Sequence, residues 1–365
     1  MKRLKILHAP AIIINQQWMI SRAQRRLGHV SDFGVLNADK RELPVRNCDI
    51  NFHFDRSEIS FKPARLYPTL KFLIKFSIFF IQALFKYDVF HFHSESFLGS
   101  HSTLDLKILK FFKKMIVFQY WGCDMRLKTP SISAEKFSTC DDCIRVCQNS
   151  RKLRDNLTHL KYADFRVYGA ADVVLSVVPD ALFIPIAIDL DYWKPTSEIP
   201  EKYLLPKTEN VRILQAFENA KARGDQKGTR FIKAAVEALK NEGRKIDYIY
   251  LEKVPYEAMR YYYQQADIVV DQLLAGWHGS VAVEAMAMGK PVICYLNEVG
   301  QRFIPKDNPI VNANPRTITD KLRMLVEDAS LREKIGKSGK RYVEDRHDVL
   351  KLAKVYIALY QKKWR

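Results

Sequence analysis

The stretch from residue 266 to residue 296 reads ADIVVDQLLAGWHGSVAVEAMAMGKPVICYL, and it decides the fold. Its apolar start predicts a strand that ends at Leu273, and a short loop containing glycine leads to a helix beginning near Gly279 and Ser280. Gly289 then closes the helix, and a second apolar strand follows at once. A strand, a loop, a helix and a further strand in this order are typical of a parallel α/β sheet.

The predicted helix start suits a phosphate group, because the first turn of a helix carries unpaired backbone N–H groups and the positive end of the helix dipole. Glu284 lies one turn into the helix, where its carboxylate is placed to accept hydrogen bonds from a ribose diol. The alternative interpretation is a plain helix of a Rossmann-like domain, with Glu284 as a solvated side chain.

The same alternation of apolar runs and amphipathic stretches extends over the whole chain. We predict strands at Lys5–Leu7, Val35–Leu36, Val89–His93, Met115–Tyr120, Val173–Val177, Leu182–Ile184, Arg212–Phe217, Asp247–Leu251, Ile268–Leu273 and Pro291–Leu296. Helices are predicted at Gln17–Leu27, Leu70–Lys86, Arg230–Asn241, Tyr256–Gln265, Val281–Met288 and Thr317–Asp328. Near-continuous apolar strands separated by helices predict an α/β protein with two doubly wound parallel sheets.

The boundary between the two units is a polar segment, Asp189–Asn210, which contains three prolines and shows no periodicity. We therefore expect an N-terminal Rossmann-like domain over residues 1–188, a linker over 189–210 and a C-terminal Rossmann-like domain over 211–348. The remaining residues, 349–365, are basic and helical in pattern. We expect this last helix to pack back on the N-terminal domain.

The composition excludes several classes of protein. Of the 365 residues 47% are hydrophobic and 27% charged, which excludes a disordered chain, a collagen and a small disulfide scaffold. The net charge of +18 indicates an anionic partner, such as nucleic acid, an anionic lipid surface or a phosphorylated substrate. No zinc-finger, RRM or KH pattern supports nucleic acid. Six cysteines, the lack of an evident signal peptide and the lack of a long apolar window favour a cytoplasmic protein.

In the segment EAMAMGKPVI the sequence resembles the retaining "group 1" glycosyltransferases of the GT-B fold. Members of that family carry two glutamates with seven residues between them, and the second of the two begins this segment. The resemblance implies that Glu284 binds the ribose of a nucleotide and that the position of the first glutamate, a contact of the donor sugar, is Gly276 here. Trp277 and His278 flank that position and are candidates to replace the missing side chain.

A second match lies at residues 221–229, KARGDQKGT, directly after a predicted strand. Family members carry a basic pair here, roughly six residues apart, that neutralises the donor diphosphate and stabilises the leaving group. Lys227 and Gly228 match the Lys-Gly end of the motif, and Lys221 or Arg223 is the candidate for the other cation. The alternative is a solvated basic loop.

Weaker matches extend the resemblance over most of the chain, namely residues 184–193 (IPIAIDLDYW), residues 87–93 (YDVFHFH) and the helices ending at YVEDRHD. The resemblance implies two Rossmann-like domains facing each other across a cleft. It further implies transfer of a sugar from a UDP- or GDP-linked donor, with retention of configuration and without a metal or other cofactor. The implied acceptor is a cell-surface glycan or a lipid-linked saccharide, as in polysaccharide biosynthesis. The alternative is a degenerate GT-B protein that binds nucleotide or glycan without transfer.

The N-terminal half departs from the family pattern. Its first loop lacks glycine, and Asn15 and Gln16 are the candidate acceptor-side hydrogen-bonding groups there. Trp121 stands where family members tend to carry a histidine that contacts the donor sugar. We therefore consider His93, Trp121 and Asp124 as catalytic candidates and Arg126 as an acceptor-side residue. His93 and its neighbour His91 could equally be buried core residues.

Four cysteines, Cys123, Cys140, Cys143 and Cys147, include one close pair and could hold a structural metal, or could be ordinary thiols of an insertion loop. The predicted helix Leu70–Lys86 is apolar except for a stripe formed by Lys71, Lys75, Gln82 and Lys86. Such a helix can lie on an anionic membrane surface, which would make the protein peripheral on the inner face of the membrane. The alternative is a helix packed in the N-terminal domain with one solvated edge.

Overall fold

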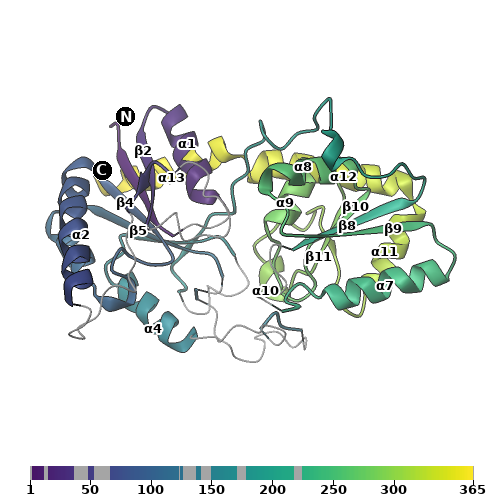
Figure 1. Ribbon diagram of the computed structural model, residues 1–365, viewed down its shortest axis with the longest axis horizontal. Helices are drawn as coiled ribbons and strands as arrows, with labels where there is room; N and C mark the ends of the chain where they lie inside the picture. The colour runs from purple at the N-terminus through teal and green to yellow at the C-terminus, as the bar shows by residue number, and fades with distance from the viewer. Residues whose placement is uncertain are drawn as a thin grey trace.

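The computed structural model describes residues 2–11, 15–36, 48–52, 66–122, 124–125, 137–140, 149–170, 178–217 and 224–364. These residues form two parallel sheets, each covered by helices on both faces, and the two halves lie side by side (Figure 1). The chain has the doubly wound α/β architecture predicted from its sequence.

The N-terminal sheet has seven strands in the order β3-β2-β1-β4-β5-β6-β7, all parallel. Its strands are β1 (Lys5–Pro10), β2 (Val30–Val35), β3 (Ile50–Asn51), β4 (Val89–His93), β5 (Met115–Tyr120), β6 (Phe165–Tyr168) and β7 (Leu182–Phe183). The helices of this half are α1 (Gln16–Arg26), α2 (Leu66–Lys86), α3 (Leu104–Phe111) and α4 (Asn149–Leu160), with a 3₁₀ turn at Gly99–His101.

The C-terminal sheet has five strands in the order β12-β11-β10-β8-β9, again all parallel. They are β8 (Val211–Phe217), β9 (Ile246–Glu252), β10 (Ile268–Val270), β11 (Val292–Cys294) and β12 (Val311–Asn312). The helices of this half are α7 (Thr229–Asn241), α8 (Tyr256–Gln265), α9 (Ser280–Ala287), α10 (Glu298–Gln301), α11 (Ile318–Glu327) and α12 (Ala329–Arg346), with a 3₁₀ turn at Glu201–Tyr203. The last elements of the chain are α13 (Val349–Gln361) and a 3₁₀ turn at Lys362–Trp364.

Several predicted elements differ from the observed ones in their bounds. The strand predicted to reach Leu273 ends at Val270, because the backbone beyond it leaves the sheet and the N–H of Leu273 bonds to the carbonyl of Lys227 at 3.0 Å. The strand predicted at Val35–Leu36 instead spans Val30–Val35, since two of its polar residues, Ser31 and Asp32, are buried and bonded. The strand predicted at Val173–Val177 lies outside the described residues.

The chain crosses between the halves twice, and the two crossings are hydrogen-bonded to each other. The N–H of Ile188 donates to the carbonyl of His347 at 2.8 Å, and the N–H of Val349 donates to the carbonyl of Ile188 at 3.0 Å. After the second crossing α13 packs against α1 on the N-terminal sheet, so both chain ends lie in that half (Figure 1).

Candidate functional site

Each sheet has one point where the strand order reverses, and ligands of doubly wound folds bind at the carboxyl ends of the strands there. In the C-terminal sheet that point lies between β8 and β10, and in the N-terminal sheet between β1 and β4. The candidate residues of the sequence analysis gather at both places.

At the C-terminal switch point Lys227 forms an ion pair with Asp271. The Lys227 ammonium lies 2.8 Å from Asp271 Oδ1 and also donates to the carbonyl of Ala216 at 3.0 Å. The other carboxylate oxygen of Asp271 accepts the N–H of Gly279, the N-cap of α9, at 2.7 Å. The Asp271 side chain is only 1% exposed, so its charge depends on these partners.

Sequence reasoning missed Asp271. The available signal was an acidic residue directly after the apolar run IVV, at the carboxyl end of a buried strand. The lysine is therefore not part of a solvated loop, and its neighbour Gly228 caps α7 in the left-handed conformation at φ 75°.

Glu284 is buried, at 7% exposure, which contradicts its interpretation as a solvated side chain. Its Oε2 accepts the hydroxyl proton of Tyr263 at 3.1 Å. Burial raises the pKa of Glu284 to about 8, the nearby Asp271 adds to the rise, and the Tyr263 hydrogen bond opposes it. The carboxyl group is therefore largely protonated at neutral pH.

Glu284 also lines a small cavity between the two halves of the molecule. Its walls come from α1, from the crossing segment at residues 186–188 and from α8 and α9, and they include Gln16, Trp193, Tyr256, Ser280 and Glu284. The structure thus brings together three predicted site residues, Gln16, Ser280 and Glu284.

Gly276 stands in a backbone conformation that only glycine adopts readily, at φ 74°. A Cβ atom there would lie 2.5 Å from Nδ2 of Asn297, whose Oδ1 is held by the N–H of Gly300 at 2.7 Å. A larger side chain at this position would therefore have to adopt a positive φ and displace the Asn297 side chain.

Both aromatic neighbours of Gly276 are buried. Trp277 is buried at the junction of the halves, with its ring 5.7 Å from that of Phe183 of β7. His278 stacks on Trp277 and is also buried, which lowers its pKa to about 4. Both residues pack the junction between the two sheets.

On the acceptor side, the Gln16 amide makes two hydrogen bonds within the protein. It donates to the carbonyl of Ala187 at 2.9 Å and accepts the N–H of the same residue at 2.7 Å, which ties α1 to the crossing segment. Asn15 precedes α1 with a left-handed backbone, φ 56°, and its carbonyl accepts the N–H of Met19 at 2.9 Å.

Asp124 serves as the anchor of a turn at the end of β5. Its carboxylate accepts the hydroxyl of Ser94 at 2.7 Å and the N–H groups of Gly122 and Trp121 at 2.8 and 3.1 Å. The Trp121 ring stacks on the ring of His93 at 6.2 Å. These contacts bring the three catalytic candidates together, with Asp124 committed to the backbone.

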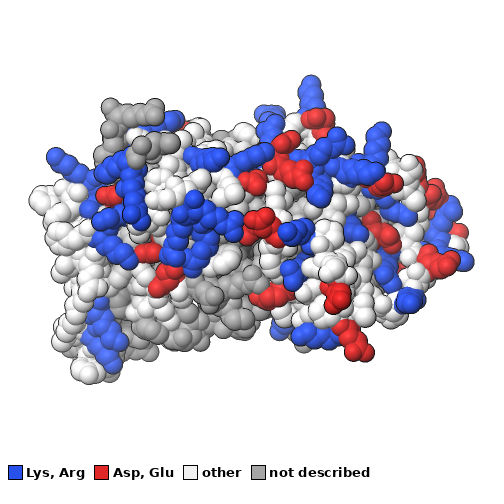
Figure 2. All heavy atoms as spheres, turned by 90° about the horizontal axis from the view of Figure 1, so that it is seen from above, with Lys and Arg blue, Asp and Glu red and all other residues white. Residues whose placement is uncertain are grey.

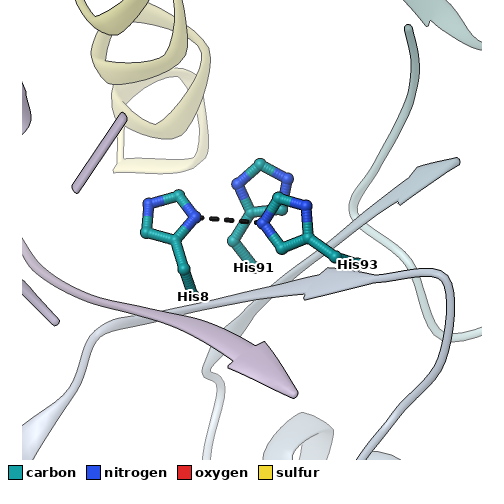
Figure 3. Close-up of side chains that lie close together, drawn as sticks. All are labelled: His8, His91 and His93. Carbon is teal, nitrogen blue, oxygen red and sulfur yellow. Dashed lines mark hydrogen bonds between the residues drawn. The ribbon is translucent and has the colours of Figure 1, made fainter. Parts of the chain in front are cut away.

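His93 belongs to a buried cluster with His8 and His91 at the N-terminal switch point (Figure 3). Nδ1 of His8 lies 3.2 Å from Nε2 of His93, and His91 stacks on His93 with ring centroids 4.4 Å apart. Burial lowers the pKa of all three, that of His8 to about 4, so the rings are neutral at pH 7.

Several predicted residues lie outside the described part of the chain, namely Lys221, Arg223, Arg126, Cys123, Cys143 and Cys147. Cys140 is described, and its neighbour Thr139 contacts the C-terminal half. Thr139 donates its N–H to the carbonyl of Leu274 and its hydroxyl to the carbonyl of Gln226, both at 3.0 Å. The insertion of the N-terminal half therefore reaches the loop that carries Lys227.

A separate surface of interest is α2, which forms one outer edge of the N-terminal half (Figure 1). Its inner face packs Phe72, Phe76 and Phe80 into the core. Its outer side exposes further large apolar residues: Tyr67, Leu70, Leu73, Ile74, Ile78, Ile81 and Phe85. Lys71, Lys75 and Lys86 are exposed on the same helix.

Positively charged side chains predominate on one face of the molecule. Figure 2 shows Lys and Arg side chains over both halves of one face, with fewer Asp and Glu among them. In the part of the chain that the structure describes, no helix is long and apolar enough to cross a membrane.

The architecture and the two switch-point sites define the class of protein. The fold matches that of Thermosynechococcus elongatus sucrose-phosphate synthase with a TM-score of 0.66, at 15% identity and 99% coverage of each chain. Anabaena HepE, solved with UDP and glucose, matches at 0.62 and 12% identity, over 98% of this chain and all of that one. The catalytic domain of Arabidopsis thaliana starch synthase IV, solved with ADP and acarbose, matches at 0.63 and 11%, over 99% of each chain. The chain has the GT-B fold.

The family follows from the C-terminal half. Residues 222–342, about a third of the chain, match the family described as Glycosyl transferases group 1. The similarity to that family is therefore shown for the C-terminal half of the chain. A comparison with curated protein sequences finds no match. Family and fold together support a nucleotide-sugar-dependent glycosyltransferase.

Proposed function

We propose that the protein transfers a hexose from a UDP- or GDP-linked donor to a cell-surface glycan or lipid-linked acceptor. The observation that carries the proposal is the match of residues 222–342 to the group 1 family, and the ion pair of Lys227 with Asp271 beside the start of α9 supports it. HepE, of the same fold, was solved with UDP and glucose, which is consistent with such a donor.

Each donor-side residue has a distinct role in this proposal. Glu284 would bind the ribose diol, and the diphosphate would lie against the free N–H groups of the first turn of α9. Lys227 would turn from Asp271 toward the phosphates and stabilise the negative charge that develops on the leaving group. Asp271 would keep the N–H of Gly279 and hold the helix start in place.

We further propose that transfer retains the anomeric configuration and needs no metal at the diphosphate. The family resemblance supports retention, and a lysine at the phosphate position supplies the positive charge that a divalent ion supplies elsewhere. The cavity shared by α1, α9 and the crossing segment is where a donor on the C-terminal half would meet the acceptor side.

We also propose that the enzyme acts at the surface of an anionic membrane and docks through α2. Seven large apolar side chains are exposed on this helix together with three lysines. Apolar groups can enter the boundary between headgroups and acyl chains, while lysines contact anionic headgroups. A membrane-bound enzyme of this kind would meet a lipid-linked acceptor without releasing it into water.

The first experiment is a thermal-shift panel with UDP, GDP, ADP and their sugar conjugates. A ligand that binds the native state raises the unfolding midpoint by mass action. One nucleotide should stabilise the wild type and not Glu284→Ala or Lys227→Ala. Glu237→Ala and Lys240→Ala, on the surface of α7, are the matched controls and should respond like the wild type. No shift with any nucleotide contradicts the donor-site proposal.

Transfer itself needs a second readout. The sugar nucleotide that stabilises the wild type in the thermal-shift panel is incubated with the enzyme in the presence of EDTA. Release of its nucleoside diphosphate supports metal-independent transfer. Magnetic resonance of the product then reports the anomeric configuration. If the protein binds the sugar nucleotide but releases no nucleoside diphosphate from it, whether an acceptor is added or only water is present, the result favours a degenerate GT-B protein that binds without transfer.

A further inference from the structure

Three histidines occupy one face of the N-terminal sheet at its switch point. In the parallel pairing of β1 with β4, His8 lies opposite His91. His93 follows two residues later on the same strand, and side chains two apart point to the same face. All three rings therefore project together from the carboxyl ends of the two central strands (Figure 3).

The nitrogen atoms of this cluster are arranged as metal ligands are. One ring nitrogen from each histidine lies within 4.8 Å of the other two. Nδ1 of His8 and Nε2 of His93 are 3.2 Å apart, and two nitrogens bound to one tetrahedral zinc ion at ~2.0–2.1 Å lie about 3.3 Å apart.

Two polar side chains outside the cluster, Gln24 and Tyr360, orient the rings of His8 and His91. Nε2 of His8 lies 2.9 Å from Oε1 of Gln24, an oxygen that also accepts the hydroxyl of Ser31 at 2.7 Å. An acceptor at this place holds the proton of His8 on Nε2, which leaves the lone pair of Nδ1 facing the cluster. Nδ1 of His91 lies 2.7 Å from the Tyr360 hydroxyl, which can accept its proton and leave Nε2 free to coordinate.

Among the residues that the structure describes, two buried ring nitrogens of the cluster find no hydrogen-bond partner. They are Nε2 of His91 and Nδ1 of His93, on side chains that are 0% and 2% exposed. A buried polar atom without a partner costs about 1–3 kcal/mol. A bound ion would give Nε2 of His91 a partner and relieve that cost.

We propose that His8, His91 and His93 bind one divalent transition-metal ion, with Zn²⁺ as the best match to three imidazole nitrogens. The ligand atoms are Nδ1 of His8, Nε2 of His91 and Nε2 of His93. Three-histidine zinc sites complete their coordination with water. Gln24 and Tyr360 then act as the outer partners that fix the orientation of two of the rings. The three nitrogens, which lie within 4.8 Å of one another, must draw closer together on binding.

The position of the site indicates a structural role. His8 belongs to β1, His91 and His93 to β4, Gln24 to α1 and Tyr360 to α13. An ion here would join the central strands to the C-terminal helix, which is the last element of the chain to reach this half. The site lies on the other sheet from Lys227 and Glu284, so it is separate from the donor site proposed above.

The test begins with the metal content of the full-length wild-type protein. After removal of metal with a chelator and titration with Zn²⁺, we expect about one tightly bound ion per chain and a rise in the unfolding midpoint of several degrees. Replacement by Co²⁺ should give visible d–d absorption typical of nitrogen and oxygen ligands, without the intense near-ultraviolet band of a cobalt–thiolate bond. That spectrum also separates this site from one formed by the cysteines at residues 123–147.

The matched variants are His91→Gln and His93→Gln, with His101→Gln, exposed on the same half, as control. Each of the first two should lose most of the bound metal and the zinc-dependent rise in midpoint, and the control should keep both. Failure to bind Zn²⁺ or Co²⁺ at this stoichiometry overturns the proposal, as does a thiolate spectrum or full metal content in both cluster variants. The Co²⁺ spectrum of the wild-type protein tests the proposed site even if the variants fold poorly. None of these measurements depends on nucleotide binding.

Discussion

Among single residues, Glu284, Asp271 and Lys227 set the charge of the donor-side site before any ligand arrives. Lys227 is paired with Asp271, and Glu284 is kept largely protonated by burial. The side chains therefore contribute little net charge at neutral pH. Among the described residues of the proposed donor site, the N–H groups in the first turn of α9 then remain to attract a phosphate.

Glu284→Gln is expected to stabilise the protein while weakening nucleotide binding. The folded-state pKa of about 8 lies above the ordinary value of 4.5, so the unfolded chain loses this proton first as pH rises. The free energy of unfolding therefore falls between about pH 4.5 and pH 8, and the glutamine variant avoids that loss. The gain at pH 8 is on the order of 4 kcal/mol.

The measurement is chemical denaturation of both proteins at pH 5 and at pH 8. The variant and the wild type should differ little at pH 5, with the gap opening toward pH 8. Glu237→Gln, exposed on α7, serves as the control and should show no such divergence. An equal difference at both pH values would mean that Glu284 titrates normally.

Gly276→Ala is expected to destabilise the protein more than the same change at Gly243. Both glycines have positive φ, 74° and 82°, so alanine strains the backbone at each by about 1 kcal/mol. Of the two, Gly276 faces a neighbour, since its Cβ would lie 2.5 Å from Asn297, whereas at Gly243 no atom of the described residues lies within 4 Å. We expect an additional loss of about 1–3 kcal/mol at Gly276.

Urea denaturation of the two variants measures this difference directly. Equal losses would show that Asn297 moves away without cost. In that case the absence of the family's first glutamate would not be a steric requirement.

At the scale of elements, α2 is apolar on both its inner and its outer side. The phenylalanines at positions 72, 76 and 80 account for its place in the core, whereas the exposed Ile74 and Ile78 have no such role. A helix packed in the domain with one solvated edge was one sequence-based hypothesis. The observed helix is packed, and its outer side is apolar as well as basic.

Ile74→Asp combined with Ile78→Asp is expected to reduce binding to anionic vesicles at least tenfold. Each change removes an exposed apolar group and adds a charge that anionic headgroups repel. Co-sedimentation with phosphatidylglycerol-containing vesicles is the measurement, with phosphatidylcholine vesicles as the comparison. Leu204→Asp, at a residue with the same kind of exposure in the linker, is the control. Unchanged vesicle binding of the double variant would exclude α2 as the docking helix.

In the whole molecule the two halves share a continuous core. One cluster of buried residues includes Phe90 and Ile116 of the first sheet together with Leu214 and Val269 of the second. Trp277 connects the halves through its contact with Phe183, and the two chain crossings are hydrogen-bonded to each other. The interface therefore resembles a domain core and is unlike a loose hinge.

We expect the wild type to unfold in a single calorimetric transition, because separating the halves would expose this shared core. Trp277→Ala removes a large buried side chain from the interface at a cost of about 3–5 kcal/mol and should split or broaden the transition. Trp18→Ala, within the N-terminal half, should lower the midpoint without splitting it. Two resolved transitions in the wild type would show that the halves unfold independently.

Local pattern in the sequence determined the parallel α/β class, the strands Val89–His93 and Met115–Tyr120 and the helix Tyr256–Gln265, because the period of apolar residues reports burial along one element. It also pointed to Lys227 and Glu284, since both lie in motifs of contiguous residues. Only the tertiary structure decided that Asp271 pairs with Lys227, that Asn297 closes the space at Gly276 and that His8 meets His91 and His93. The partners in each case are 21 to 85 positions apart or lie on different elements, and distances of that kind arise from strand order and packing, which no local period encodes.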